Sequence, residues 1–182
     1  FANLFKDKSR AALQRVTIWN SSITDGGLKR VLHFHLRDLD LAYCKNLTPR
    51  AFELINDYGK NLRTLSIGSD VKIVPEDSFD EDLKSRSWRI DGDNGDDCFF
   101  GYLLNAPNLH RLVLKEVRQV PKFYATMIMN LPKLTHLDLS CCWDVGDLSY
   151  LSYCPNLLSL TLFNCANLQN AIPNICQLTK LR

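Results

Sequence analysis

Leucines recur along the chain in a pattern that predicts a stack of similar structural units. In residues 134–142 the order is leucine, two residues, leucine, one residue, leucine, two residues and cysteine. Two leucines that lie two positions apart point to the same side of a β-strand, and the residue between them points away. A lone strand of this kind cannot bury its leucines, whereas stacked copies can. The pattern therefore predicts an α/β leucine-rich-repeat solenoid, curved, with parallel strands on its concave face and helices or turns on its convex face.

Six complete copies of the pattern are present, and a seventh begins near the end of the chain. The copies start at Leu13, Leu36, Leu62, Leu109, Leu134, Leu157 and Leu181. The eighth residue after the first leucine is the position at which the chain turns inward, where a small, weakly polar side chain fits beside the unpaired backbone groups. The residues predicted at this turn are Ser21, Cys44, Asp70, Val117, Cys142 and Cys165.

Short helical segments are expected between the strands. They are predicted at 1–12, 29–33, 98–105, 121–129 and 147–153. A further helix is predicted to follow Thr48, with Thr48 as its N-cap and Pro49 as its first residue. The Ile23–Leu28 segment, with two adjacent glycines, is predicted as a turn in which Thr24 or Asp25 caps the following helix. Pro173 is expected to limit any helix near it to about one turn.

One interval between successive copies, from Leu62 to Leu109, is 47 residues long, whereas the others range from 23 to 26. Either two degenerate repeats or one repeat with an insertion of about 20 residues accounts for this length, and we favour the insertion. Residues 70–97 contain ten acidic and four basic side chains. This acidic segment is interpreted as a solvated loop rather than a calcium site, because the position that should hold the last glutamate of an EF-hand, counted from Asp91, is Tyr102. The chain is thus predicted to be one domain, residues 1–182, with six to seven repeats and an acidic insertion near 70–97, and we expect it to be a piece of a longer protein.

Composition narrows the classes of partner. The 22 basic and 20 acidic residues give a net charge of +2, which gives no reason to expect a nucleic-acid or anionic-membrane partner, and no apolar run approaches a membrane-spanning length. The seven cysteines are an odd number and several occupy repeat positions, so they do not resemble a secreted disulfide framework. We expect reduced thiols, hence a cytoplasmic or nuclear protein, and a monomer.

The outward-pointing strand positions are the candidate protein-binding site. The predicted site residues on this concave face are Arg15, Thr17, Trp19, Asp38, Asp40, Arg111, Lys115, His136, Asp138 and Phe163. Exposed aromatic side chains such as Trp19 and Phe163 are enriched in protein interfaces. The alternative is a solvated sheet face that binds no partner.

No residues form a recognisable catalytic, cofactor or metal site. Cys141 and Cys142 lack the two-residue spacer of a zinc knuckle, and no cysteine–histidine–asparagine set is apparent. The shared repeat position of Cys44, Cys142 and Cys165 already accounts for these three cysteines. We therefore predict no enzymatic activity, no cofactor and no metal.

Two family resemblances bear on function. The cysteine-ended repeats, with Ile23–Leu28 and Cys154–Leu157, resemble those of F-box substrate receptors. A closer resemblance, through Ala2–Asp7, Leu13–Val16, Leu36–Leu39, Cys44–Leu47 and Lys60–Ile67, is to the leucine-rich segment of the zyg-eleven and zer-one homologue family. The acidic insertion, the later repeats and the ending at Leu178–Arg182 follow the same order, so this resemblance covers nearly the whole chain.

The zyg-eleven and zer-one resemblance implies a substrate receptor of a cullin-two RING ubiquitin ligase, which directs proteins with N-terminal glycine degrons to proteasomal degradation. In that family a box before the repeats binds elongin and cullin-two, and armadillo-like repeats after them bind the degron. Neither region is in this sequence, so none of the family's degron-binding residues is assigned here. The alternatives are an F-box receptor and a general protein-interaction solenoid unrelated to ubiquitin.

Overall fold

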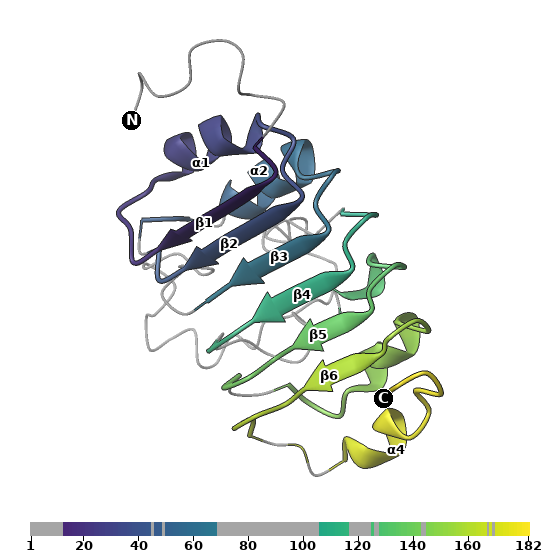
Figure 1. Ribbon diagram of the computed structural model, residues 1–182. Coiled ribbons are helices and arrows are strands. Elements are labelled where there is room, and N and C mark those ends of the chain that lie inside the picture. Colours follow the sequence, from purple (N-terminus) through teal and green to yellow (C-terminus); the bar gives the residue numbers. More distant parts are fainter. Residues whose placement is uncertain are drawn as a thin grey trace, which may run out of the picture.

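The computed structural model describes residues 13–44, 46–48, 50–68, 106–116, 125, 128–142, 145–166, 168 and 170–182. Its central feature is one open sheet of six parallel strands that follow one another in chain order (Figure 1). The strands are β1 (Arg15–Trp19), β2 (Asp38–Ala42), β3 (Thr64–Ile67), β4 (Arg111–Leu114), β5 (His136–Asp138) and β6 (Ser159–Thr161). Each contains leucine-pattern positions, which confirms the predicted α/β leucine-rich-repeat fold.

The register of the sheet places equivalent repeat positions side by side. Val16 pairs with Leu39, Leu39 with Leu65, Leu65 with Leu112, and the series continues through Leu137 to Leu160. One face of the sheet is therefore a continuous layer of aliphatic side chains, which packs under the helices and forms the core. The other face, called the strand face below, carries the alternate residues.

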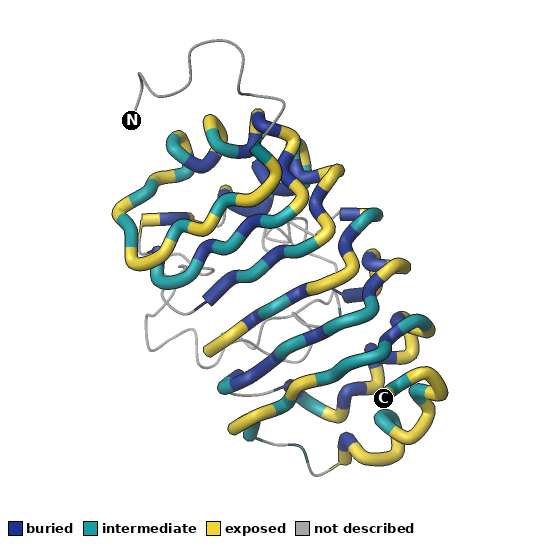
Figure 2. The backbone as a smooth tube through the Cα atoms, in the orientation of Figure 1, coloured by how far each residue is buried: buried dark blue, intermediate teal, exposed yellow. Residues whose placement is uncertain are grey.

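Burial is complete in the middle of the stack and incomplete at its two ends (Figure 2). Leu39, Leu65 and Leu112 are at most 1% exposed, whereas Val16 in β1 and Leu160 in β6 are only half-buried. Each inner strand is covered by a repeat on both sides, and the outer strands are covered on one side only among the described residues. The terminal repeats therefore gain less from apolar burial than the inner ones.

A repeated pair of backbone hydrogen bonds joins the beginnings of neighbouring strands. The carbonyl oxygen of Gln14 accepts from the amides of Arg37 and Asp38, at 2.8 and 3.0 Å. The same pair of bonds recurs in the four following repeats, with carbonyl acceptors on Arg37, Arg63, His110, Thr135. At the end of the chain the amide of Arg182 donates to the carbonyl oxygen of Leu158 over 2.9 Å, so the seventh repeat begins in register with the sixth.

The strands end in a residue of left-handed backbone conformation, seven positions after the first leucine. The described residues at this position, with φ between 47° and 61°, are Asn20, Tyr43, Glu116, Cys141 and Asn164. The left-handed residue reverses the chain direction and brings the following turn residue inward. Because non-glycine residues adopt this conformation at some cost, its recurrence indicates that the packing of the repeats enforces it.

The turn cysteines connect neighbouring repeats through their thiols. Cys44, Cys142 and Cys165 each donate to a backbone carbonyl of the preceding repeat, on Ile18, Leu114 and Leu139, with sulfur–oxygen distances of 3.4, 3.0 and 2.9 Å. A thiol is a small apolar group with a weak donor, which matches a buried position facing one carbonyl. The predicted role of these cysteines at the turn is confirmed.

Two helices cover the N-terminal repeats on the core side of the sheet (Figure 1). The predicted boundary of the first was wrong: α1 spans Asp25–Leu32 and includes both glycines that we assigned to a turn. The Thr24 side chain accepts a hydrogen bond from the amide of Gly27 at 3.4 Å, so this N-cap starts the helix four residues earlier than expected. α2 spans Arg50–Tyr58, and the Thr48 hydroxyl accepts from the amide of Arg50 at 3.2 Å, in agreement with the predicted cap.

The C-terminal repeats use shorter helical turns. The segment predicted as a helix at 147–153 contains a 3-10 helix, η4 (Ser149–Tyr153). At its start, the Asp147 side chain accepts a hydrogen bond from the backbone amide of Ser149. α4 (Ile172–Ile175) is one turn long and contains Pro173 near its start, as predicted. The helices expected at 1–12 and 98–105, most of that at 121–129, the acidic segment, and the turn residues Asp70 and Val117 lie outside the described residues.

The long interval between the third and fourth repeats leaves no gap in the sheet. β3 pairs directly with β4, with Thr64 opposite Arg111 and Ile67 opposite Leu114. An additional repeat in this interval with its own strand in the sheet would have separated β3 from β4. The described sheet therefore continues across the interval as if the two repeats were consecutive.

Candidate protein-binding face

The strand face brings the predicted site residues onto one surface as three parallel rows. The first row contains Arg15, Asp38, Thr64, Arg111, His136 and Ser159, which pair across the strands. The second row contains Thr17, Asp40, Ser66, Val113, Asp138 and Thr161. The third row, at the strand ends, contains Trp19, Ala42, Gly68, Lys115, Ser140 and Phe163. All ten predicted residues belong to these rows, and their role in binding stays a prediction.

Charges on the strand face are partly paired across neighbouring strands. Arg15 Nε lies 3.1 Å from Asp38 Oδ2, and Lys115 Nζ lies 3.6 Å from Asp138 Oδ2. The Asp138 carboxylate also accepts from the amide of Ser140 at 2.9 Å, which holds it in place. Since both cations are more than half exposed, these pairs contribute little to stability and leave the charges accessible to a partner.

The two predicted aromatic residues are well exposed but far apart. Trp19 is 68% and Phe163 72% exposed; Trp19 is the last residue of β1, and Phe163 follows the end of β6 by two residues. Five strand spacings separate β1 from β6, roughly 24 Å across the sheet. The face therefore offers two separate aromatic contacts, which only a partner that spans most of the sheet could use together.

A side chain that the sequence analysis missed extends the aromatic contact at β1. The ring of Tyr43 packs edge-on against Trp19 with centroids 5.9 Å apart, and its hydroxyl donates to Glu116 Oε1 at 3.2 Å. Both Tyr43 and Glu116 occupy the left-handed position after their strands. That position could have been included in the predicted face, because the pattern places it directly after the last outward-pointing residue.

Asp40 has an unused acceptor in the middle of the face. Its Oδ1 atom is buried and has no hydrogen-bond partner within the described residues. The third row beside it carries only the small residues Ala42 and Gly68, and a side chain added at Gly68 would lie 3.3 Å from Ala42. A buried oxygen without a hydrogen-bond partner carries an energetic cost.

Burial affects the acidity of three of the described thiols. The six described cysteines are all unpaired. Burial raises the pKa of Cys154 to about 12, and it raises the pKa of Cys44 and of Cys165. Because the thiolate is the reactive form of cysteine, burial lowers the reactivity of these three thiols.

The histidines are bound to nearby groups rather than gathered with other ligands. His110 Nδ1 lies 2.7 Å from the carbonyl oxygen of Asn108, and His136 Nδ1 lies 2.9 Å from Thr135 Oγ1. In the part of the chain that the structure describes, no three His, Cys, Asp or Glu side chains come together as a metal site. Over the same residues, no helix combines the length and apolarity that crossing a membrane requires.

Comparison with known proteins agrees with this architecture. Residues 125–182, which include β5, β6 and α4, match the family described as Zer-1-like, leucine-rich repeats. The chain is also 29% identical over 183 residues to the protein zer-1 homolog of Drosophila melanogaster. This similarity covers 98% of the chain and 20% of the relative, so the chain spans about a fifth of the length of the curated relative that it matches.

The six-stranded parallel sheet and its cysteine turns define a leucine-rich-repeat protein of the cysteine-ended type. The family match over residues 125–182 and the similarity over nearly the whole chain show that it resembles Zer-1-like leucine-rich-repeat proteins. The family resemblance expected from the sequence is thereby confirmed.

Proposed function

We propose that this chain is the non-catalytic leucine-rich-repeat domain of a substrate receptor in a cullin-RING ubiquitin ligase of the cullin-two and elongin type. The observation that carries the proposal is the 29% identity to the zer-1 homolog over 98% of the chain. Through regions beyond these residues, the whole protein would bind elongin and cullin-two and would recognise substrates with N-terminal glycine degrons. It would act in the cytoplasm or the nucleus.

Within such a receptor the solenoid has two roles that its physical properties support. Its continuous core and in-register backbone bonds make it a rigid spacer between the flanking regions. Its strand face, with exposed Trp19 and Phe163, is a second docking surface for the substrate protein.

The ligase assignment is tested by capturing the full-length protein from cells and identifying the associated cullin by mass spectrometry. Cullin-two together with elongins is the expected result. Cullin-one with its F-box adaptor would replace the proposal by an F-box receptor. No cullin, in cells where a known cullin-two receptor is captured in parallel, would leave a protein-interaction solenoid unrelated to ubiquitin.

The role of the strand face is tested separately with a double variant, Trp19→Ala with Phe163→Ala. The matched control is Tyr153→Ala with Ile172→Ala, because these two side chains are exposed and lie outside the strands. We expect the strand-face variant to keep its cullin and to lose at least one co-captured protein that the control retains. Identical sets of captured proteins would remove the strand face from the proposal and leave the solenoid as a spacer.

A further inference from the structure

The basic residues of the described chain gather along one edge of the solenoid, where the strands begin. We define this strand-start edge as the residues from two before to two after the first leucine of each repeat. It holds eight of the twelve described Lys and Arg residues and one of the eight described Asp and Glu residues. The eight are Arg15, Arg37, Lys60, Arg63, Arg111, Lys133, Lys180 and Arg182.

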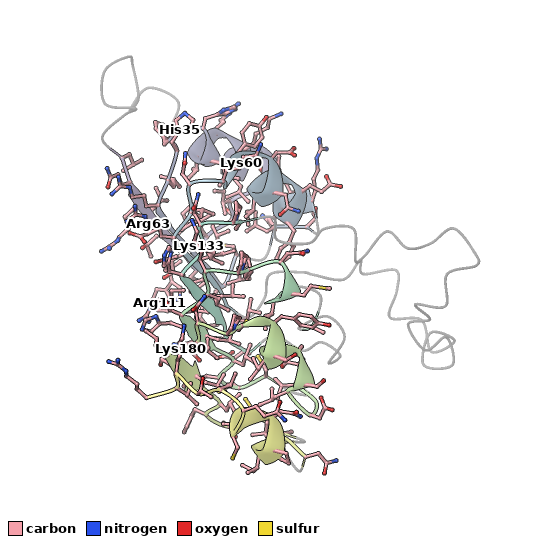
Figure 3. The ribbon with its side chains drawn as sticks, turned by 90° about the vertical axis from the view of Figure 1, so that its right-hand side faces the viewer. His35, Lys60, Arg63, Arg111, Lys133 and Lys180 are labelled. Carbon is pink, nitrogen blue, oxygen red and sulfur yellow. The ribbon has the colours of Figure 1, made fainter. Side chains whose placement is uncertain are left out.

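These side chains follow one another down the edge rather than scattering over it. Figure 3 faces this edge, and the labelled side chains from His35 to Lys180 lie in one column from top to bottom. All eight basic residues are exposed. Arg37, Lys60, Arg63 and Arg111 form no ion pair within the described residues, and Asp38, the one carboxylate of the edge, is bound to Arg15. The edge therefore presents uncompensated positive charge.

Two of the three lysines of the edge, Lys133 and Lys180, are held in place by asparagine side chains. Lys133 Nζ donates to Asn108 Oδ1 at 2.8 Å, and Lys180 Nζ donates to Asn156 Oδ1 at 2.7 Å. The amide of Asn108 in turn donates to the carbonyl oxygen of Lys60 at 3.1 Å. Each ammonium group has three donors and uses one of them here, so it keeps donors for a ligand. Side chains fixed in this way lose less conformational entropy on binding.

A hollow of about 580 Å³ lies at the centre of the edge. Its lining includes Arg37, Arg63, His110 and Lys133, and no acidic side chain of the described residues contributes to it. The backbone beneath it is already satisfied, since the carbonyl oxygens of Arg37 and Arg63 each accept two hydrogen bonds from the next repeat. A ligand in this hollow would therefore be recognised by side chains and by charge.

The neighbouring strand face limits the shape of an anionic ligand. Asp40 and Asp138 lie on that face, two residues beyond the edge in their own strands, and Asp38 lies within the edge itself. A wide polyanion such as a nucleic acid would lie over these carboxylates as well as over the basic edge, and like charges repel. A single extended peptide is narrow enough to remain on the edge. Eight extended residues span roughly 27 Å, close to the roughly 24 Å between the first and sixth strands.

We propose that the strand-start edge is a docking groove for an extended, Asp- and Glu-rich segment of a partner protein. Arg37, Arg63 and Arg111 bind its carboxylates through guanidinium hydrogen bonds, for which the planar fork of arginine is well suited. This proposal is independent of the ubiquitin-ligase assignment, because it rests on the charge and geometry of the edge alone.

The test is fluorescence anisotropy with the full chain and a labelled twelve-residue peptide in which Asp and Glu alternate with Ser. We expect the wild type to bind this peptide, with an affinity that falls as salt rises from 0.05 to 0.3 M, and to bind a matched Asn/Gln peptide at least tenfold more weakly. The triple variant Arg37→Gln, Arg63→Gln, Arg111→Gln should weaken binding of the acidic peptide at least tenfold. These exposed side chains make no described ion pair, so thermal unfolding of the variant should match the wild type.

The matched control is Lys29→Gln, Arg30→Gln, Arg50→Gln, which changes the net charge equally but lies on α1 and α2. Its affinity for the acidic peptide should stay within twofold of the wild type.

Equal weakening by both triple variants, or no binding of the acidic peptide to the wild type, would overturn the proposal. Tighter binding of a single-stranded oligonucleotide of equal charge would assign the edge to nucleic acid instead. Binding that emerges only after deletion of residues 70–97 would assign it to the acidic segment of the chain itself.

Discussion

The thiol of Cys142 donates a hydrogen bond to the carbonyl oxygen of Leu114, 3.0 Å away and in the preceding repeat. Both residues are buried, with Cys142 1% exposed and Leu114 fully enclosed. The carbonyl lies at the end of β4, where the strand ladder with β5 stops. The thiol thus satisfies a backbone acceptor that the sheet leaves open, and the same relationship recurs at Cys44 and Cys165.

Replacing Cys142 with alanine should lower the free energy of unfolding by about 1–2 kcal/mol, because a buried carbonyl loses its donor and the site loses contacts. Urea unfolding followed by circular dichroism measures the change. Cys176→Ala is the control, since Cys176 is exposed and should tolerate the substitution with no significant loss. Equal losses in the two variants would contradict a specific role for the turn thiol.

Stability should depend on pH through Cys154. Burial raises the pKa of this thiol from 9.0 to about 12, so above pH 9 the unfolded chain loses a proton that the folded chain keeps. The contribution of the thiol is therefore complete below pH 9 and is lost as the pH rises towards 12, by at most about 1.4 kcal/mol per pH unit. The stability difference between the wild type and Cys154→Ala should shrink between pH 8.5 and 10.5 in urea titrations. A difference that stays constant over this range would contradict the prediction.

Cys141 has a left-handed backbone conformation, with φ 61°, which glycine adopts easily and β-branched residues adopt only at a cost. Cys141→Val should lower the free energy of unfolding by about 1–2 kcal/mol, because a β-branched side chain is disfavoured in this conformation. Cys141→Gly should cost less than the valine substitution. Ser159→Val, on the extended backbone of β6, serves as the control and should be nearly neutral. If valine were tolerated equally at both positions, the left-handed turn would not be enforced by packing.

The incomplete burial at the C-terminal side predicts a response to added repeats. Extending the chain beyond Arg182 by one leucine-rich repeat in register should raise the melting temperature, because Leu160 and Leu181, now half-buried, would become covered. A polar extension of equal length is the control and should leave the melting temperature unchanged. The same melting temperature with both extensions would show that the terminal repeat is already capped.

Sequence periodicity predicted the six strands because each strand repeats a spacing that has one physical interpretation, burial of every second side chain. The sequence prediction was less successful for α1. The two adjacent glycines suggested a turn, but the N-cap at Thr24 starts a helix that includes both of them. The basic edge was not predicted at all. Arg37, Arg63 and Arg111 are 26 and 48 residues apart along the chain, and the nearly balanced net charge conceals their convergence. Only the stacking of repeats brings them together, although alignment of the residues around each first leucine could have revealed them.

The direct pairing of β3 with β4 has a consequence for how such a protein changes over time. The chain between these two strands is about twice as long as between the others, yet the register of the sheet is the same. For a flexible connection, doubling the length costs only about 0.6 kcal/mol in closure entropy. The connection between two neighbouring strands can therefore change in length at little thermodynamic cost, without moving either the strand face or the basic edge. Natural variants that differ in length here should keep the same two surfaces.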